Sequence, residues 1–509
     1  MEKVNYPAKD PAFAQVAFTC QTAEPNDGEI RDMIDELLSQ LFGGRGLRAV
    51  VKPGDHVVIK TNIVMCCQGA RGEKGRAVIT DPRITRYVAE KVREVIGWAG
   101  GADLKVVDAC FSPDPNPSNP DNRCSFHWAR LNRTPDNTVS PEDICCDYDC
   151  DGYLDGPSRA QLVNLDAIGP EGRDLHTVRM ADGREVKVAF PRFLRTREEA
   201  GGEGEFTDVL IGLPVFKNHW YVGVSGALKL HYGFRSLPAC LGDTGRRGHE
   251  GFYTTWEDGK LTPHHLDRLQ NYLAAEHRIR TYDLVIMDCL TANRDGPGSP
   301  SGAVSYSRDI DERVDYITTH SLLASRDAVA IDTVETAFAG YRPESVGLTK
   351  VAAENGVGIC DQAHILMLAG ERFKFQKLRL ADAYGAEGKY PLSTSGNPVA
   401  EKDVGPKYTV TITDFTRRPD ADGLLHVRYA VTSAVRGTNP DICRVDLVIA
   451  GEIVRSYLGG GLLENEFTFR YADYDTMNHA YLVGMVCAWD SSFNCVPSYS
   501  EFFIPPAEG

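Results

Sequence analysis

The order of elements within residues 56–109 constrains the fold more than any other part of the chain. Residues 56–64 (HVVIKTNIV) form a short apolar run, which is typical of a strand buried in a parallel sheet. Asp81-Pro82 is a helix-start signal, and apolar residues follow at helical spacing until Gly100-Gly101. Residues 104–109 supply a second strand. Such a βαβ unit joins parallel strands by a right-handed crossover, so the segment predicts an α/β fold.

The same alternation of strand and helix patterns continues to about residue 355. It predicts a doubly wound, mostly parallel sheet. After about residue 404 the pattern changes to strand-like runs separated by turn residues, with no helical period: 408–414, 426–432, 444–450, 466–471, 480–488 and 498–504. This pattern predicts a β-sandwich of immunoglobulin or fibronectin type.

The chain is therefore expected to contain four parts, consistent with several domains in 509 residues. Residues 1–109 and 171–403 form the two parts of the α/β domain. Residues 110–170 are rich in Cys, Asp, Asn and Pro and form an insertion, and 404–509 form the sandwich.

Charge and hydropathy exclude two classes of partner. Lys and Arg number 55 against 71 Asp and Glu, which leaves a net charge of −16. Such a chain lacks the broad positive field that attracts nucleic acid or anionic membranes. Residues 482–489 are about the longest apolar run, well short of the roughly 18 residues that a membrane span needs. We expect no nucleic-acid partner and no membrane span.

The 14 cysteines are unevenly placed and indicate a compartment. Two pairs are adjacent, Cys66-Cys67 and Cys145-Cys146, and no C-x-x-C occurs. The absence of that spacing disfavours zinc ribbons and ferredoxin clusters, although another thiolate metal site stays an alternative. Disulfides that cross-link a loop-rich insertion are the favoured interpretation, and they require an oxidising compartment. We expect a periplasmic or secreted protein, whose signal peptide is not present in this chain.

Residues 147–155 (DYDCDGYLD) carry the sharpest local motif, a loop of alternating carboxylates. Oxygen ligands at positions 1, 3, 5, 7 and 9, with glycine at 6, suit calcium. The expected ligands are the carboxylates of Asp147, Asp149, Asp151 and Asp155 and the carbonyl of Tyr153. Position 12 is Ser158, where an EF-hand has glutamate, so the loop resembles the calcium loops of thrombospondin type 3 repeats. The alternative is an acidic surface turn.

The densest set of polar residues lies at 213–235. Ligands of α/β sheets bind beyond the carboxyl ends of the strands, and a glycine-rich turn into a helix offers amides to an anion. We expect the catalytic residues to be Lys60, Lys217, His219 and Lys229. The residues expected to hold a ligand or cofactor are Asn62, Ser225, Gly226 and His231. A lysine on a buried strand is costly without a partner or ligand, whereas histidines in loops also cluster by chance.

Three aspartates at predicted strand ends and helix starts are weaker candidates. Asp288 ends a strand, and Asp327 and Asp332 lie at a strand-to-helix junction. They can serve as acid–base or metal-binding groups. For Asp327 a helix N-cap is an equal alternative. Asp332 follows five residues later, inside the helix, so the two do not share one helix face.

Several motifs in order resemble the domain of unknown function 362 family. They are Lys60-Thr-Asn62, Thr80-Asp81-Pro82, Leu213-Pro-x-x-Lys217-x-His219, Ser225-Gly-Ala-Leu-Lys229, Asp288, Gly296-Pro297 and Arg326-Asp327-Ala-Val-Ala-x-Asp332. The resemblance spans about residues 50–370 and leaves the insertion and the sandwich outside. It implies no particular reaction. Some relatives are exported, which agrees with the disulfide argument.

The spacing His219-x9-Lys229 also resembles the lactate racemase segment that holds a nickel-pincer cofactor. Carried over, His219 is a metal ligand and Lys229 a covalent anchor. The chain departs from that pattern at Cys110, where no histidine follows the strand, and at Ala227, which stands where the racemases have a second glycine.

These observations predict an extracytoplasmic α/β enzyme or cofactor-binding protein. Its Lys/His site binds a small anionic ligand, a carboxylate or phosphate. The alternative is a secreted structural or binding protein, stabilised by calcium and disulfides, in which the site is vestigial and the sandwich mediates self-association or contact with a surface partner.

Overall fold

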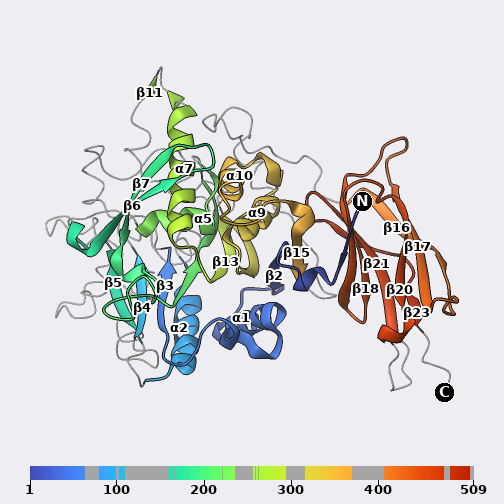
Figure 1. Cartoon of the computed structure of the whole chain (residues 1–509), viewed down its shortest axis with the longest axis horizontal. Helices are drawn as coiled ribbons and strands as arrows, with labels where there is room; N and C mark the ends of the chain where they lie inside the picture. The colour runs from blue at the N-terminus through green and yellow to red at the C-terminus, as the bar shows by residue number, and fades with distance from the viewer. Residues whose placement is uncertain are drawn as a thin grey trace. The chain divides into compact units, whose positions relative to one another are not determined.

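A computed structural model describes residues 1–62, 80–98, 103–108, 160–165, 168–219, 222–234, 256–257, 260–261, 263–293, 316–368, 406–474 and 482–504. These residues divide into two compact units (Figure 1). Residues 15–360 form what we call the α/β unit. Residues 1–14, 361–368 and those described from 406 to 504 form what we call the β unit.

A mixed sheet forms the centre of the α/β unit. Its strands, in spatial order, are β2 (Ala14–Cys20), β14 (Tyr316–Ser325), β13 (Leu284–Asn293), β8 (Val209–Leu213), β3 (His56–Thr61), β4 (Asp103–Asp108) and β5 (Gln161–Asn164). Neighbours from β13 to β5 are parallel, whereas β14 is antiparallel to both β13 and β2. The predicted α/β arrangement is confirmed. The sheet is mixed because the β13–β14 pair is antiparallel and needs no crossover helix.

Helices cover the sheet from two sides (Figure 1). On one side, α1 (Asp27–Phe42) packs on β14 and α2 (Pro82–Ile96) packs on β3 and β4. On the other, α5 (Ala227–Leu230) contacts β8, and α9 (Ala328–Phe338) contacts β14. Helices α7 (Pro263–Ile279) and α10 (Gly347–Glu354) pack against each other on this second side. Among the described residues, no helix has the length and apolar character needed to cross a membrane.

Local sequence signals explain where the long helices begin and end. Asn26 caps α1 in a capping box with Glu29, each side chain accepting the other's backbone N–H. Asp81 caps α2 by accepting the amide of Arg83 at 2.9 Å, as its sequence predicts. That helix ends at Gly97, where φ is 75°, rather than at the expected Gly100-Gly101. Gly97 adopts the left-handed conformation at little cost, so it stops the helix first.

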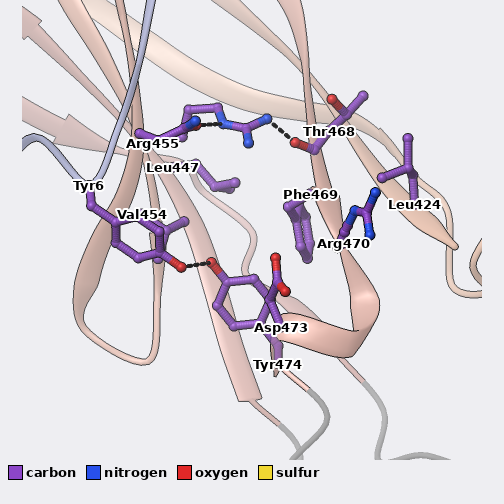
Figure 2. Close-up of a pocket in the computed structure, with 11 residues that line it drawn as sticks. Tyr6, Leu424, Leu447, Val454, Arg455, Thr468, Phe469, Arg470, Asp473 and Tyr474 are labelled. Atoms are coloured by element: carbon purple, nitrogen blue, oxygen red, sulfur yellow. Dashed lines mark hydrogen bonds between the residues drawn. The ribbon is translucent and has the colours of Figure 1, made fainter.

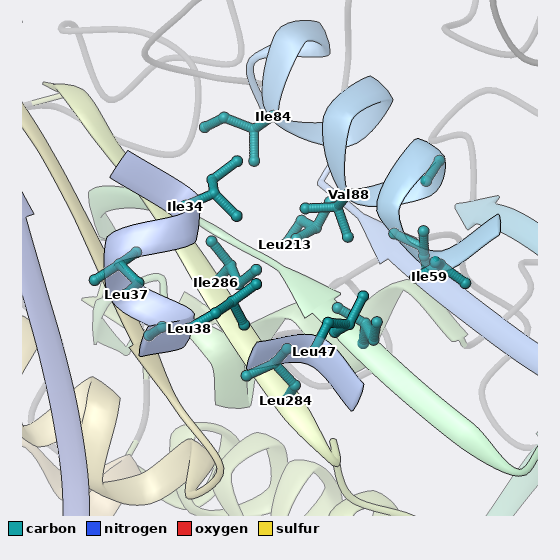
Figure 3. Close-up of a cluster of buried hydrophobic side chains, with 14 of the residues drawn as sticks. Ile34, Leu37, Leu38, Leu47, Ile59, Ile84, Val88, Leu213, Leu284 and Ile286 are labelled. Atoms are coloured by element: carbon teal, nitrogen blue, oxygen red, sulfur yellow. The ribbon is translucent and has the colours of Figure 1, made fainter. Parts of the chain in front are cut away.

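A single apolar cluster joins α1 and α2 to the sheet (Figure 3). Ile59, Leu284 and Ile286 alternate with residues of the opposite face, as strand geometry requires. The residues labelled in the figure are Ile34, Leu37, Leu38, Leu47, Ile59, Ile84, Val88, Leu213, Leu284 and Ile286. The cluster fixes the positions of β3, β8 and β13, whose carboxyl ends carry the predicted site.

Shorter strands complete the α/β unit. The hairpin β6 (Arg173–Arg179) and β7 (Glu185–Pro191) turns at Gly183, where φ is 86°. Strand β9 (Val215–His219) pairs with β10 (Gly223–Val224) and with β13. The remaining pair is β11 (Trp256–Glu257) with β12 (Lys260–Leu261).

The β unit consists of two antiparallel sheets that share one apolar core. One sheet contains β16 (Tyr408–Phe415), β17 (Leu424–Ser433) and β20 (Glu464–Arg470). The other contains β1 (Glu2–Asn5), β19 (Glu452–Leu458), β18 (Ile442–Ile449), β21 (Leu482–Asp490), β22 (Cys495–Pro497) and β23 (Phe502–Ile504). Val427 and Phe467 of the first sheet lie in one cluster with Val445 and Val486 of the second. Strand β15 (Ile365–Leu368) also belongs to this unit.

The N-terminal strand differs from the sequence expectation. Residues 1–109 were expected in the α/β domain, but residues 1–14 belong to the β unit. Strand β1 pairs with β19, from Glu2 opposite Leu458 to Asn5 opposite Arg455. Such pairing joins residues about 450 positions apart, which no local sequence pattern indicates.

Replacing Leu284 by Ala tests the apolar cluster of the α/β unit. Leu284 is fully buried, so we expect the free energy of unfolding to fall by roughly 2–5 kcal/mol. Leu175→Ala is the matched control, because that side chain is 72% exposed and surface changes stay within about 0.5 kcal/mol. Urea unfolding followed by circular dichroism measures both. Equal effects of the two substitutions would contradict the packing described.

Candidate functional site

The candidate site lies where β3, β4 and β9 end. Lys60 on β3, Asp108 on β4 and Lys217 on β9 are buried there. Asp288 is also buried, but it lies in the middle of β13 rather than at the expected strand end, and it contacts the start of α2. The carboxyl edge of a parallel sheet is the usual position of ligand sites in α/β proteins. The arrangement therefore brings Lys60 and Asp108 near Lys217, although Lys217 is far from both in sequence.

Lys60 already has a carboxylate partner. Its side chain is 1% exposed and forms an ion pair with Asp108. Its Nζ also donates to the carbonyl of Thr61 at 2.7 Å and lies 5.8 Å from the centroid of the Phe234 ring. A side chain at Gly233 would collide with the Lys60 ammonium. Lys60 is thus held in place by the protein itself.

Burial disfavours the charge of both Lys217 and Lys229. Burial lowers the pKa of Lys217 to about 7, and the charge of Lys60 adds to this while Asp108 and Glu335 oppose it. Burial lowers the pKa of Lys229 to about 7 as well, with Lys217 and Lys60 contributing in the same direction. The three lysines therefore occupy one buried region, and two of them titrate near neutral pH.

Carboxylates of α9 determine the position of the helix that carries Lys229. Asp332 accepts the amides of Ala227 at 2.6 Å and Leu228 at 2.9 Å, at the start of α5. Burial raises the pKa of Asp332 to about 7. A side chain at Gly226 would collide with the carboxylates of both Asp332 and Glu335. The structure therefore gives Gly226 a packing role, besides its predicted role at a ligand.

Asp327 lies away from this contact and caps α9. Its Oδ1 accepts the amides of Val329 and Ala330, and its Oδ2 accepts that of Ile359 at 3.0 Å. The helix-cap interpretation of Asp327 is confirmed. Asp332 and Asp327 do not act on a common partner among the described residues.

His231, on the short helix η10 (His231–Phe234), is fully buried among aromatic rings. Its ring stacks on His277 with centroids 3.6 Å apart and meets the edge of Tyr282 at 4.5 Å. Neither of its ring nitrogens has a hydrogen-bond partner within the described residues. Burial, with His277 and Lys60 adding to it, lowers its pKa well below the ordinary value, so the ring is neutral.

His277, Tyr282 and Glu276 were not identified from sequence. Burial lowers the pKa of His277 to about 3, and its Nε2 lies 3.2 Å from the carbonyl of Leu228. Glu276 is fully buried on α7 and acts electrostatically on Lys229. Glu276 and His277 lie on α7 and Tyr282 follows it, and polar residues at apolar positions of a helix are the signal that could have identified the first two.

The motif residues around Asn62 hold strand ends together. The amide of Asn62 donates to Thr80 Oγ1 at 2.9 Å, and the Thr80 hydroxyl donates to the carbonyl of Leu213 at 2.6 Å. Asp288 accepts the amides of Asp81 at 2.8 Å and Leu290 at 3.0 Å. Burial and the nearby Asp81 raise the pKa of Asp288 to about 7. These contacts lock β3, β8 and β13 at one edge.

Several predicted residues lie partly or wholly outside the described part of the chain. Strand β9 ends at His219, but the side chain of His219 lies outside the described residues. Ser225, in contrast, lies within the described residues. It is buried, and its amide donates to the carbonyl of Lys217 at 2.8 Å. The calcium-loop residues Asp147, Asp149, Asp151, Tyr153 and Asp155 lie outside the described residues. In the described ranges, no group of three or more His, Cys, Asp and Glu side chains is arranged to hold a metal ion.

The pKa of Lys229 predicts a pH-dependent stability. Between pH 7 and 10.5 the unfolded chain keeps a proton that native Lys229 has released. The free energy of unfolding therefore rises with pH in this window, by at most about 1.4 kcal/mol per pH unit for one group. Lys229→Met should lose this contribution, whereas Lys350→Met, at an exposed position, should keep it. Urea unfolding at pH 7, 8, 9 and 10 measures how the free energy of unfolding changes with pH in the unaltered chain and the two variants. The same pH dependence in all three proteins would refute the prediction.

Two solved structures are similar to parts of this chain. One contains the fibronectin(III)-like modules of Clostridium thermocellum CbhA, at 17% identity and a TM-score of 0.14, over 20% of this chain and 100% of that one. The other is a crystal structure of a Thermotoga maritima protein, at 12% identity and a TM-score of 0.29. That match covers 53% of this chain and 52% of the other, so the chain spans about half the length of that protein. These scores carry no argument about function.

A family model matches the centre of the chain. No curated protein matches this chain. The resemblance to the lactate racemase segment stays a prediction. The matched residues, 165–337, begin just after β5, end within α9, and contain the lysines of β9 and α5 and the aspartates of β13 and α9. They are narrower than the span of about 50–370 expected from the motifs. Residues 165–337 match the model of the family described as a domain of unknown function (DUF362), which supports the family resemblance seen in the motifs.

Proposed function

We propose that the α/β unit is the enzymatic or cofactor-binding part of the protein and holds a small anionic ligand, a carboxylate or a phosphate, at Lys217 and Lys229. The observation that supports this most strongly is the burial of both amines, 1% and 8% exposed, in one region at the carboxyl edge of the sheet. Burying a lysine is costly unless it meets a partner or a ligand.

An anion suits these amines because it raises their pKa again, whereas burial lowers it. A negative charge beside a desolvated amine favours its protonated form, and the low local dielectric strengthens the attraction. Lys60 contributes less to ligand contact, because Asp108 already neutralises it. We assign the direct ligand contacts to Lys217 and Lys229, because both amines are buried in the same region, and we assign to Lys60 an effect on the local field.

His231 and His219 are the candidate proton-transfer groups. The neutral ring of His231 has one donor and one acceptor nitrogen, and neither is used within the described residues. We assign His219 the role of general base or metal ligand, from its position at the end of β9. Lys229 is then an electrostatic stabiliser or, with a nickel-pincer cofactor, its covalent anchor.

The finer expectations on compartment and modules belong to the same proposal. The calcium loop of Asp147 to Asp155 would order the insertion, and disulfides would cross-link it in a periplasmic or secreted protein. The two sheets that share one core in the β unit support a sandwich of immunoglobulin or fibronectin type. Cys20, Cys289, Cys443, Cys487 and Cys495 are free thiols in the described ranges, and the Cys487 thiol lies within hydrogen-bond reach of the Cys495 thiol.

Calorimetry with inorganic phosphate and with acetate tests the lysine site. At pH 8 the amines are largely neutral, so binding should take up protons, which titrations in two buffers of different ionisation enthalpy measure. Lys217→Met and Lys229→Met should each weaken binding by about tenfold or more. Lys350→Met is the matched control and should bind like the unaltered chain.

Three outcomes of this titration would overturn the proposal. Neither anion binding to the unaltered chain would exclude a site for a carboxylate or phosphate. Binding that persists in both lysine variants would place the anion elsewhere. Binding without proton uptake would show that the contacting groups are not amines with a lowered pKa.

Intact mass and elemental analysis of the natively purified full chain test the compartment. We expect about one equivalent of calcium and a mass lower by two hydrogens for each disulfide. A fully reduced chain without calcium would contradict both parts of the expectation. Stoichiometric nickel, or added mass on Lys229, would instead support the nickel-pincer alternative.

A further inference from the structure

The β unit contains a cavity of about 430 Å³ beside strands β19 and β20. Figure 2 shows its aromatic and charged lining, in which Tyr6 and Tyr474 lie next to each other, Arg470 lies beside Phe469, and Arg455 reaches toward Thr468. All its lining residues belong to this unit. The cavity is separate from the lysine site and does not depend on the function proposed for it.

Aromatic rings form one wall of the cavity. Phe469 is buried, and its ring meets the edge of the Tyr474 ring with centroids 5.5 Å apart. The hydroxyls of Tyr6 and Tyr474 face each other at 3.4 Å, as the dashed line in Figure 2 shows. These rings give the cavity apolar faces with polar tips.

The backbone of Tyr6 is held in a strained conformation at the cavity edge. Its φ is 47° and its ψ is 60°, in the left-handed region that bulky side chains rarely adopt. Such strain persists only where surrounding contacts impose it, and it is concentrated at ligand clamps and active sites. Here it directs an aromatic side chain to the cavity.

The polar side of the cavity contains one fixed and one available guanidinium. Arg455 donates to Asn5 Oδ1 at 2.7 Å and to the carbonyl of Thr468. The side chains of Arg470 and Asp473 are exposed and form no hydrogen bond or ion pair within the described residues. Figure 2 shows both beside the ring of Phe469. An available guanidinium binds carboxylates in a bidentate manner.

We propose that this cavity binds an acidic pyranose, such as a uronic acid unit of a polysaccharide. The C–H face of the sugar packs on the aromatic rings, and its hydroxyls hydrogen-bond to Asp473 and the tyrosine hydroxyls. Its carboxylate pairs with Arg470. The volume lies within the range of small-molecule sites, about 300–1,000 Å³, which combine apolar walls with a few convergent polar groups.

Titration of the full-length chain with glucuronate, glucose and acetate tests this assignment. Calorimetry or saturation-transfer NMR should detect glucuronate, with glucose and acetate each weaker by about tenfold or more. Arg470→Ala should reduce the affinity for glucuronate to that for glucose and leave the affinity for glucose unchanged. Arg436→Ala is the matched control, because Arg436 is also exposed in the β unit, and it should change nothing. Tyr474→Phe removes one hydroxyl without removing the ring and should weaken both sugars.

Each other result contradicts the proposal in a different way. No binding of glucuronate overturns it. If acetate binds as tightly as glucuronate, the site recognises only a carboxylate. If glucose and glucuronate bind equally, Arg470 has no role in recognition. An unchanged circular dichroism spectrum of Arg470→Ala ensures that a loss of binding reports on the cavity rather than on folding.

Discussion

The contact between Asp332 and the first amides of α5 is the interaction on which the site depends. It fixes α5 against α9, and α5 carries Lys229 into the interior. Gly226 permits the contact, because any side chain there would collide with the carboxylates of α9. The first amides of a helix have no partner within the helix itself, so an anionic side chain that accepts their hydrogen bonds is stabilised there. This stabilisation offsets part of the cost of burying a carboxylate.

The charges at the carboxyl edge are arranged so that burial acts differently on each group. Lys60 stays paired with Asp108, whereas the pKa values of Lys217 and Lys229 fall to about 7 and those of Asp288 and Asp332 rise to about 7. Groups whose pKa lies near the working pH are suited to proton transfer. These pKa shifts support the proposal of a reactive site at this edge of the sheet, which is separate from the site proposed in the β unit.

Sequence patterns predicted individual helices and strands better than they predicted which of these elements contact one another. The helix cap at Asp81 follows from local chemistry and is confirmed. Strand β1 was missed because its partner β19 is distant in sequence, and the antiparallel β13–β14 pair has no local signature. Within the site, Lys60, Lys217 and Lys229 were recognised by type and position. Their neighbours Glu276, His277 and Tyr282 were not, because a polar residue on an apolar helix face does not reveal what it meets.

The sequence by itself determined the α/β pattern, the strand-rich C-terminal part and the family motifs of residues 165–337, because periodicity, caps and glycines act over a few residues. Only the tertiary structure decided that Lys60 has Asp108 as its partner and that Gly226 faces α9. It also decided that Lys217 and Lys229 are buried together, and thereby their pKa values. Desolvation and Coulomb interactions depend on distances between residues far apart in the chain, and folding alone sets those distances.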